Sequence, residues 1–372
     1  MKDRTADVIV VGGGLVGCSA AYYLAREGLG VTVFDSGDLA EGASGACEGF
    51  LSLQSKPLGE ALAMARESLA EYAALGEALG ADMELRRAGG MTIVDQPEGM
   101  SGARRLCEAL TAVGVIAELL SPREARRLAP VLCPDIAGAV YCAEEAMVNP
   151  WQVVRALAAA AADRGARFVR YTRVLRILAS RGRVTGVVTT RACGSDQEAD
   201  WSGGYVVLAA GVGSPALGET VGVDIPVRPR RGQVLVTEKA HATLKPFLLG
   251  PSYVSAKLGP PPPEGGAALA LAQTAAGNFL IGGTREFVGH DLGTEPRGIA
   301  ALAREACSLA PGIRHLAVIR SFAGLRPYVD AHVPIIERVR DPEGLIIATG
   351  HGGDGVCLAP ATGKRVAALV LA

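Results

Sequence analysis

The sequence predicts an α/β fold: a doubly wound, Rossmann-like domain on a mainly parallel sheet, with an inserted α+β domain built on an antiparallel sheet. Three observations lead to this prediction. A β-branched run at 6–11, a segment of helical length at 15–27 and an apolar run at 31–34 form one β-α-β unit. Two further runs typical of buried strands lie far along the chain, at 205–210 and 345–349. Between them, short apolar runs alternate as antiparallel strands do.

The remaining segments divide between the two domains. Helical patterns occupy 61–79, 102–113, 122–128, 148–164 (starting near Pro150) and 361–371. Strand-like runs occupy 89–94, 232–238, 252–256, 268–273 and 279–284, and a proline-rich loop occupies 259–266. We expect the dinucleotide-binding domain to comprise residues 1–82, 145–225 and 321–372, and the inserted domain residues 83–144 and 226–320.

The charge balance argues against polyanionic partners. Lysine and arginine together number 37 against 38 acidic residues in a chain of 372, a formal net charge of −1. Such a chain has no excess positive field to attract nucleic acid or an anionic membrane. We therefore expect neither partner, and any anion must be held by a local site.

The N-terminal apolar stretch and the cysteines both favour a cytoplasmic protein. Residues 8–25 resemble a signal peptide or a membrane span, but their glycines fall where a strand must turn tightly into a helix. Eight cysteines are scattered without a C-x-x-C pair or a histidine cluster. Reduced thiols and no bound metal are the expectation.

A glycine-rich turn follows the first strand. Gly12, Gly14 and Gly17 give the pattern G-x-G-x-x-G, and Asp35 follows 18 residues later at the end of the next strand. Bare backbone N–H groups at a helix start bind a pyrophosphate, and the acid accepts the ribose hydroxyls and disfavours a 2′-phosphate. An ordinary glycine-rich turn is the alternative, but the strand–helix–strand–acid context favours dinucleotide binding.

Two other small-residue segments indicate FAD rather than NAD. Residues 41–50 (EGASGACEGF) follow the ribose acid and suit close approach of backbone to a ribityl chain and flavin ring. Residues 350–363 (GHGGDGVCLAPATG) place a second glycine-rich turn before the last helix, whose N-terminus would stabilise negative charge on a reduced flavin. A loop that simply starts the last helix is the alternative.

Seven motifs together resemble one family. VIVVGGGLVGCSAAYYLA, EGASGACEGF, RRAGGM, VVLAAGVGS, PVRPRRGQ, SFAGLRP and TGHGGDGVCLAPATGK occur in that order. With these motifs the chain is similar to the D-amino-acid-oxidase-type flavoproteins, glycine/sarcosine oxidase branch. The resemblance implies an FAD domain and a substrate-binding domain. It also implies hydride transfer from a carbon next to nitrogen to flavin N5, imine hydrolysis by water, and reoxidation by O2 giving H2O2.

The resemblance also implies a set of cofactor contacts. These are Gly12, Gly14, Leu15, Val16, Gly17, Asp35, Ser36, Ala43, Ser44, Cys47, Gly49, Phe50, Val174, Ala210, Gly211, Arg326, His351, Gly352, Gly353, Asp354, Gly355 and Val356. Val174 fits the place where backbone reads adenine, and a simple strand residue is the alternative. Some relatives attach FAD to a cysteine near the arginine motif; Leu325 and its neighbours include none. We therefore expect non-covalent FAD.

Three residues are the candidates for holding the substrate. Arg326 in FAGLRP matches the arginine that grips the substrate carboxylate, and Tyr253 matches a tyrosine that assists it, although an ordinary strand aromatic is the alternative. The sequence departs from the pattern at Arg285, where simple glycine oxidases carry an apolar residue, and at Gly353, where they carry an arginine. A second substrate carboxylate, as in an N-carboxymethyl amino acid or opine, is our hypothesis; an Arg285 pointing away from the pocket is the alternative.

These inferences lead to one leading function and two alternatives. The leading function is an FAD-dependent oxidase of a glycine-like or N-substituted amino acid. GHGGDG and LQSKP are also similar to subunits of proline, hydroxyproline and opine dehydrogenases, which pass electrons to a partner chain. A flavin-bound scaffold without turnover is the third. His351 is expected to contact the flavin rather than act as a base, His241, His290, His315 and His332 suggest no site, and a homo-oligomer is left open.

Overall fold

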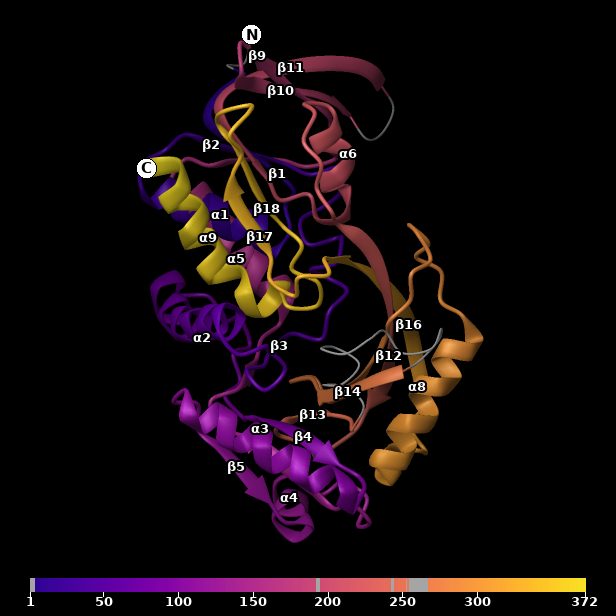
Figure 1. Ribbon diagram of the computed structural model, residues 1–372. Helices are drawn as coiled ribbons and strands as arrows, with labels where there is room; N and C mark the ends of the chain where they lie inside the picture. The colour runs from indigo at the N-terminus through magenta and orange to yellow at the C-terminus, as the bar shows by residue number, and fades with distance from the viewer. Residues whose placement is uncertain (1–3, 192–194, 242–243, 252, 254–266) are drawn as a thin grey trace.

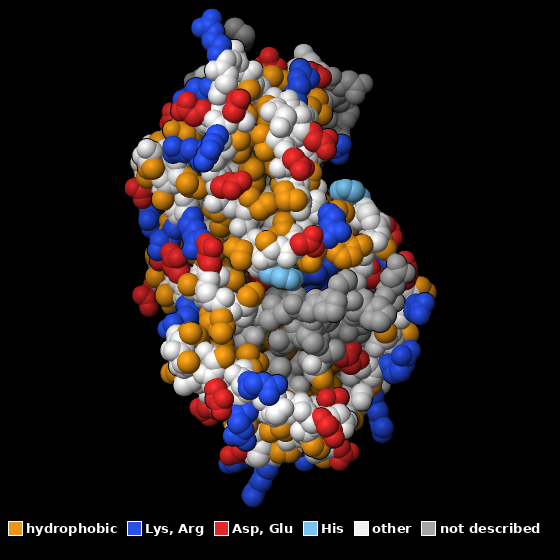
Figure 2. Space-filling view, viewed as in Figure 1, with side chains coloured by type: hydrophobic (Ala, Val, Ile, Leu, Met, Phe, Trp, Pro, Cys, Tyr) orange, Lys and Arg blue, Asp and Glu red, His pale blue; other side chains and the backbone are white. Residues whose placement is uncertain are grey.

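The computed structural model describes residues 4–191, 195–241, 244–251, 253 and 267–372. Its elements form two sheets at opposite ends of an elongated molecule, and the chain crosses between them several times (Figure 1). On the face seen in Figure 2, acidic and basic side chains are interspersed with apolar ones, in keeping with a net charge of −1. Among the helices in these ranges, none combines the length and apolar character needed to cross a bilayer.

The first sheet is mainly parallel and is assembled from distant segments. Its central order is β17-β18-β11-β1-β2-β8, and β10 and β9 extend β11 as an antiparallel ribbon. Parallel pairs join β18, β11, β1, β2 and β8 in sequence. The strands are β1 (Thr5–Val11), β2 (Val31–Phe34), β8 (Arg167–Val169), β9 (Thr172–Ser180), β10 (Arg183–Arg191), β11 (Ser195–Leu208), β17 (Ile335–Arg338) and β18 (Leu345–Thr349).

Both faces of this sheet are covered, which explains the uninterrupted apolar runs. Helices α1 (Leu15–Arg26), α5 (Pro150–Ala162) and α9 (Gly355–Leu371) pack together on one face, and α2 (Glu60–Leu79) packs against α9. On the other face, α6 (Ser214–Glu219) and the β9–β10 ribbon cover side chains such as Val11 and Phe34. This end of the molecule therefore has the doubly wound architecture predicted from the sequence.

The second sheet is mainly antiparallel, with the order β16-β12-β15-β14-β13-β4-β6-β5 and one parallel pair, β13 with β4. Helices α3 (Met100–Ala112), α4 (Pro122–Leu128) and α8 (Pro296–Leu309) pack on it. Its strands are β4 (Gly90–Val94), β5 (Ala117–Leu120), β6 (Gly138–Cys142), β12 (Arg228–Lys239), β13 (Phe247–Leu249), β14 (Ala267–Gln273), β15 (Asn278–Thr284) and β16 (Val318–Tyr328). A short ribbon of β3 (Phe50–Leu51) and β7 (Ala146–Met147), and the 3-10 turns η1 (Pro97–Gly99), η2 (Gly211–Gly213) and η3 (Pro311–Ile313), complete the described elements.

Strand β16 does not follow the expected division at residue 321. It pairs with β12 from Arg228–Tyr328 to Thr237–Val318, so it belongs to the second sheet and not to the dinucleotide-binding part. The sequence pattern missed this because glycine and proline interrupt the apolar run. The expected strand 252–256 and loop 259–266 lie outside the described residues, apart from Tyr253. Tyr253 is helical rather than extended, and its N–H donates to the Gly250 carbonyl (3.0 Å).

Helix α9 begins six residues before the helix predicted from the sequence, with Pro360 in its interior. A proline there removes the hydrogen bond to the carbonyl four residues earlier, Val356. The Tyr72 hydroxyl donates to that carbonyl instead (2.5 Å). The helix therefore continues through the proline, and its N-terminus moves to Gly355, beside the cavity described next.

Candidate functional site

One cavity of about 980 Å³ joins the two sheets. Its lining includes the loops at the carboxyl ends of β1, β2, β11 and β18, together with β12, β16 and the end of β15. Loops at the carboxyl edge of a parallel sheet are the usual ligand site of doubly wound folds, and the volume lies near the top of the range of about 300–1,000 Å³ for small-molecule and cofactor sites. The cavity can therefore hold an extended ligand that reaches from one sheet to the other.

The glycine turn at the start of α1 fits a phosphate group. Gly12 has φ +110°, and an added Cβ would lie 2.4 Å from the Ala209 carbonyl oxygen. Gly14 is the N-cap residue of α1, where it offers no side chain to accept a capping hydrogen bond, and it lines the cavity. Gly17 does not line it: a Cβ there would lie 1.8 Å from the Gly12 carbonyl oxygen, so its role is close packing of helix against turn. The structure therefore places Gly17, expected as a cofactor contact, outside the cavity lining.

Asp35 is fixed at the end of β2 by backbone amides. One carboxylate oxygen accepts from the Gly13 N–H (2.6 Å) and the other from the Gly37 N–H (2.8 Å). Each oxygen keeps a further lone pair, and the residue lines the cavity. A carboxylate held in this way, one turn from the phosphate position, suits the two hydroxyls of a ribose.

The segment after Asp35 closes over the start of α1. The Ser44 hydroxyl accepts from the Leu15 N–H (2.9 Å), and Trp151 Nε1 donates to the Gly45 carbonyl (3.2 Å). Cys47 also lines the cavity, but burial, with Glu48 beside it, raises the pKa of its thiol to about 12. A thiol that stays protonated is a poor nucleophile, which favours a non-covalent cofactor.

The predicted cofactor residues other than Gly17 all line this cavity. Ser36, Ala43, Gly49, Phe50, Val174, Ala210, Gly211 and Arg326 lie along its walls, as do His351, Gly352, Gly353, Asp354, Gly355 and Val356 near the start of α9. Residues 172–175 form one wall together, so the position of Val174 suits the adenine contact. The residues that the family resemblance grouped together are therefore contiguous in space.

His351 is a buried ring on the helix side of the cavity. Its Nε2 lies 3.0 Å from the Thr362 hydroxyl, and burial lowers the pKa of the imidazole to about 4. The ring is therefore neutral at physiological pH and a weak base. This agrees with a contact role rather than proton abstraction.

Lys56, which sequence reasoning left unassigned within LQSKP, forms a buried ion pair at the start of α9. Its Nζ lies 2.8 Å from an Asp354 carboxylate oxygen and donates to the Ser52 carbonyl (2.7 Å) and the Ser55 hydroxyl (3.1 Å). Burial lowers the pKa of Lys56, but the Asp354 charge outweighs this and leaves the pKa above its usual value. The pair ties the segment before α2 to the N-terminus of α9.

Arg326 enters the cavity from β16. Its Nη1 donates to the Thr284 carbonyl (2.8 Å), and its guanidinium lies against the backbone of Gly232 on the neighbouring strand, where a Cβ would come within 2.1 Å of Nη1. A Cβ on Gly283 would lie 2.7 Å from Nη2. Because Gly232 and Gly283 carry no side chains, the guanidinium can lie flat against the backbone. Its other N–H groups have no hydrogen-bond partner among the described residues and can bind a ligand.

Arg285 and Tyr253 line the same cavity. Arg285 follows β15, is 7 % exposed, and has its guanidinium carbon 5.0 Å from the centre of the Tyr253 ring. Burial lowers the pKa of Arg285, and burial raises that of Tyr253. The alternative that Arg285 points away from the pocket does not hold in this structure.

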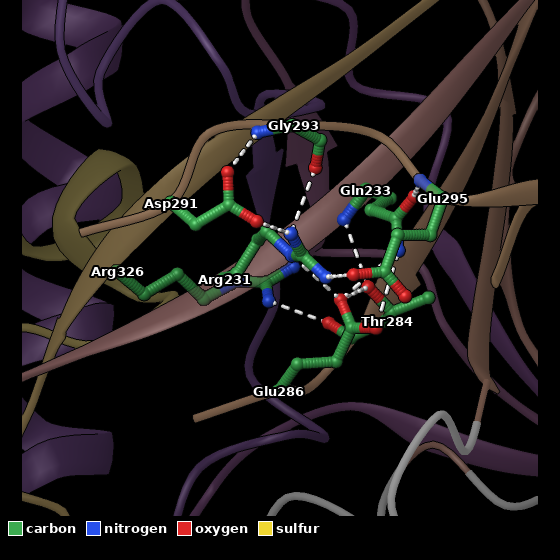
Figure 3. A network of polar contacts seen from close by, with 8 residues as sticks. All are labelled: Arg231, Gln233, Thr284, Glu286, Asp291, Gly293, Glu295 and Arg326. Carbon is green, nitrogen blue, oxygen red and sulfur yellow. Dashed lines mark hydrogen bonds and ion pairs between the residues drawn. The ribbon is translucent and has the colours of Figure 1, made fainter. Parts of the chain in front are cut away.

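Behind the cavity, Arg231 anchors the segment that follows Arg285. It is fully buried and forms ion pairs with Glu286 (3.0 Å), Glu295 (2.8 Å) and Asp291, and it donates to the Gly293 carbonyl. Figure 3 shows Arg231 between these groups, with Gln233 and Thr284 bound to Glu286 beside it. Because Thr284 also accepts from Arg326, this network fixes the carbonyl that orients Arg326.

Several lining residues were not predicted as site residues. Arg230 and Tyr328 contact each other, with 4.1 Å between the guanidinium carbon and the ring centre, and line the cavity. His290 and His332, which showed no meaningful spacing in the sequence, line it as well. Arg230 lies in the quoted motif PVRPRRGQ, but only the sheet register shows that it faces Arg326. The residue pattern alone gave no signal for the two histidines.

These features define a dinucleotide-binding α/β fold whose cavity is lined by arginines at one end. The bare glycine turn, the amide-held Asp35 and the length of the cavity fit FAD, which would lie along Gly12, Gly14, Asp35 and the start of α9. When bound, FAD supplies a two-electron acceptor.

Comparison with known proteins gives the family. The family model described as FAD dependent oxidoreductase matches residues 7–369, so the chain belongs to the FAD-dependent oxidoreductase family, and FAD is its cofactor. Glycine oxidase of Bacillus licheniformis is 31% identical over 98% of this chain and 93% of its own length. The likeness to glycine oxidases places the chain in the glycine/sarcosine oxidase-like branch.

Two further known proteins also match this chain over most of its length. The crystal structure of glycine oxidase from Geobacillus kaustophilus superposes with a TM-score of 0.88 at 27% identity, covering 99% of this chain and 95% of that one. An opine oxidase subunit of Rhizobium meliloti is 28% identical over 93% of this chain and 89% of its own length. The fold and family implied by the sequence motifs are confirmed.

Proposed function

We propose that the chain oxidises the carbon–nitrogen bond next to a carboxylate in a glycine-like or N-substituted amino acid. The observation that carries this proposal is Arg326, a cavity-lining guanidinium whose hydrogen bonds to described residues use only one of its N–H groups. The first sheet with its loops would hold FAD, and the second sheet would hold the substrate. Within this division, Arg326 fixes the carboxylate and so sets the position of the neighbouring carbon.

The overall reaction balances with water and O2. An amine R–NH–CH2–COO⁻ loses a hydride from carbon and a proton from nitrogen to give an imine, and water splits the imine into R–NH2 and glyoxylate. With the two electrons passed to O2, the products include one H2O2. The protein supplies alignment and a preorganised charge rather than a strong base, in keeping with the low pKa of His351, about 4.

Arg285 supports a second carboxylate on the substrate. It faces the same cavity as Arg326, and Tyr253 packs beside it. An N-carboxymethyl amino acid or an opine carries two carboxylates around one nitrogen. An opine oxidase subunit at 28% identity shows that this substrate class occurs among the relatives, beside glycine oxidase at 31%.

That same relative favours a second candidate function. It is named as a subunit, so this chain, too, is a candidate dehydrogenase subunit that passes electrons to a partner chain instead of O2. Proline, hydroxyproline and opines are the candidate substrates. Oxygen consumption by the purified chain decides between the two: uptake of one O2 per substrate supports the oxidase, and reduction of FAD without uptake supports the dehydrogenase.

The test of the main proposal is anaerobic bleaching of the visible absorption of the bound flavin, which reports its reduction. The panel is glycine, sarcosine, proline, D-amino acids and N-carboxyalkyl amino acids. Bleaching by one of these classes supports the proposal, whereas a yellow protein that none of them bleaches overturns it. Acid precipitation of the same sample should release all FAD into the supernatant, because the cofactor is expected to be non-covalent.

A further inference from the structure

Three arginines meet in one cavity. Arg230 on β12 pairs in register with Arg326 on β16, and Arg285 follows β15, the other neighbour of β12. All three line the cavity. Because side chains alternate along a strand, Arg230 faces the cavity while Arg231 faces the network behind the sheet.

Arg231 serves as the comparison, because its role in this protein is structural. Its Nε, Nη1 and Nη2 each reach a carboxylate, and its side chain has no exposure. Arg230 and Arg285 are each 7 % exposed, yet neither forms an ion pair with a described residue. The buried Nε atom of each has no hydrogen-bond partner among the described residues. Buried, unpaired donors of this kind point to a missing anion.

The charge around these arginines is not balanced. Glu48 is the carboxylate that borders Arg326: a Cβ on Gly283 would lie 2.7 Å from Arg326 Nη2 and 3.7 Å from Glu48 Oε1. The charge of Asp354 also acts on Arg285, but Lys56 pairs with Asp354 at 2.8 Å and offsets that charge. Burial and the charges of Arg326 and Arg285 hold the pKa of Arg230 far below its usual value, at about 9. Within the described part of the chain, three guanidiniums facing one carboxylate leave two positive charges, which a dianion would neutralise.

We propose that Arg230 and Arg285 form a second anion subsite, which binds the carboxylate that the substrate carries in addition to the one held by Arg326. The preferred substrate class is therefore an amine with two carboxylates, the second on its nitrogen substituent. The aromatic rings of Tyr328 and Tyr253 pack on the two guanidiniums and hold them in place. This inference rests on the proposed function and deepens it by naming Arg230 as a specificity-determining residue.

The test compares a dicarboxylic with a monocarboxylic substrate on the FAD-bound protein. N-(carboxymethyl)glycine and sarcosine are mixed anaerobically with the protein at increasing concentrations, and the dissociation constant of each is read from the concentration dependence of the rate of flavin bleaching. Arg230→Gln and Arg285→Gln should each raise the dissociation constant of N-(carboxymethyl)glycine by about tenfold to a hundredfold, the range for a lost charged hydrogen bond. The dissociation constant of sarcosine should stay within about threefold of its wild-type value. Arg326→Gln should weaken both.

A second readout does not depend on turnover. Glutarate, a dicarboxylate without an amine, should raise the melting temperature of the FAD-bound wild type more than acetate does, and Arg230→Gln should remove that difference. Arg176→Gln is the control, since Arg176 lies outside the cavity lining and is paired with Glu198 at the surface. The control should behave as wild type, which separates a bound carboxylate from a general positive field.

The outcomes separate this inference from the proposed function. If neither compound nor any other amino acid bleaches the flavin, the proposed function fails. If sarcosine and N-(carboxymethyl)glycine both bleach it with similar dissociation constants, or Arg230→Gln weakens both equally, the function stands and the second subsite is wrong. An equal loss in Arg176→Gln also overturns the subsite.

Discussion

Arg326 lies flat on the backbone of Gly232, so closely that a β-carbon at Gly232 would come within 2.1 Å of Arg326 Nη1 and 2.3 Å of its guanidinium carbon. The two residues sit on adjacent antiparallel strands, two positions apart in register. A glycine in a strand interior costs stability, and here it permits a close approach. The position of the guanidinium that we propose as the carboxylate-binding group therefore depends on the absence of a side chain on its neighbour.

Gly232→Ala should consequently displace Arg326 without removing any charge. We expect FAD content unchanged and the dissociation constant for substrate raised by about tenfold or more, as for a lost charged hydrogen bond. The concentration dependence of the rate of anaerobic flavin bleaching measures the effect. Gly312→Ala is the control, because a Cβ there meets nothing within 4 Å. Unaltered substrate binding in Gly232→Ala would show that the close contact between Gly232 and Arg326 is unimportant for binding.

Arg231 should matter for stability and, through Thr284, for the site. Arg231→Met leaves the carboxylates of Glu286, Asp291 and Glu295 without their cation, and loss of one partner of a buried ion pair costs about 3–5 kcal/mol. The free energy of unfolding measured with urea should fall by that amount. Arg176→Met, which breaks an exposed pair with Glu198, should change it by less than about 1 kcal/mol. Equal losses in both variants would contradict the account.

The Lys56–Asp354 pair should behave as a coupled unit. Lys56→Met removes the ammonium from beside Asp354 and is expected to lower the free energy of unfolding by about 3–5 kcal/mol. The double variant Lys56→Met/Asp354→Asn should recover part of that loss, because the buried negative charge is then gone as well. A double-mutant cycle by chemical denaturation measures the coupling. Strict additivity of the two substitutions would argue against the ion pair.

His351 should make the protein sensitive to mild acid. Its pKa is about 4 in the folded chain and about 6.5 when exposed, so the unfolded state binds more protons between these values. Stability should therefore fall as pH drops from 6.5 to 4, by up to about 3 kcal/mol from this residue, and level off below. In His351→Gln, the free energy of unfolding should depend less on pH between 6.5 and 4. Parallel pH profiles for wild type and variant would refute a buried neutral ring.

Much of the fold follows from local sequence. The β-branched runs at 6–11 and 345–349 and the glycine turn predict parallel strands with a dinucleotide site, because those residues need buried pleats and bare amides. The interrupted run in β16 hid a strand of the second sheet, and Pro360 hid the true start of α9 because Tyr72 replaces the lost hydrogen bond.

The candidate site was predictable only in part. Arg326 and Arg285 were singled out by motif and by departure from it. Arg230 was not, since the sequence shows Arg230 and Arg231 as an adjacent pair, and only the register of β12 sends one into the cavity and the other to three carboxylates. The Lys56–Asp354 pair joins residues about 300 positions apart, a distance that periodicity and spacing do not bridge.

The central claim is that the Arg326 guanidinium holds the substrate's carboxylate beside bound FAD. Anaerobic titration of Arg326→Ala with the best substrate of the wild type tests it most directly. Arg326→Ala should be yellow, with its full complement of FAD, and substrate should no longer bleach it, while dithionite still does. Bleaching of Arg326→Ala at wild-type substrate concentrations would contradict it.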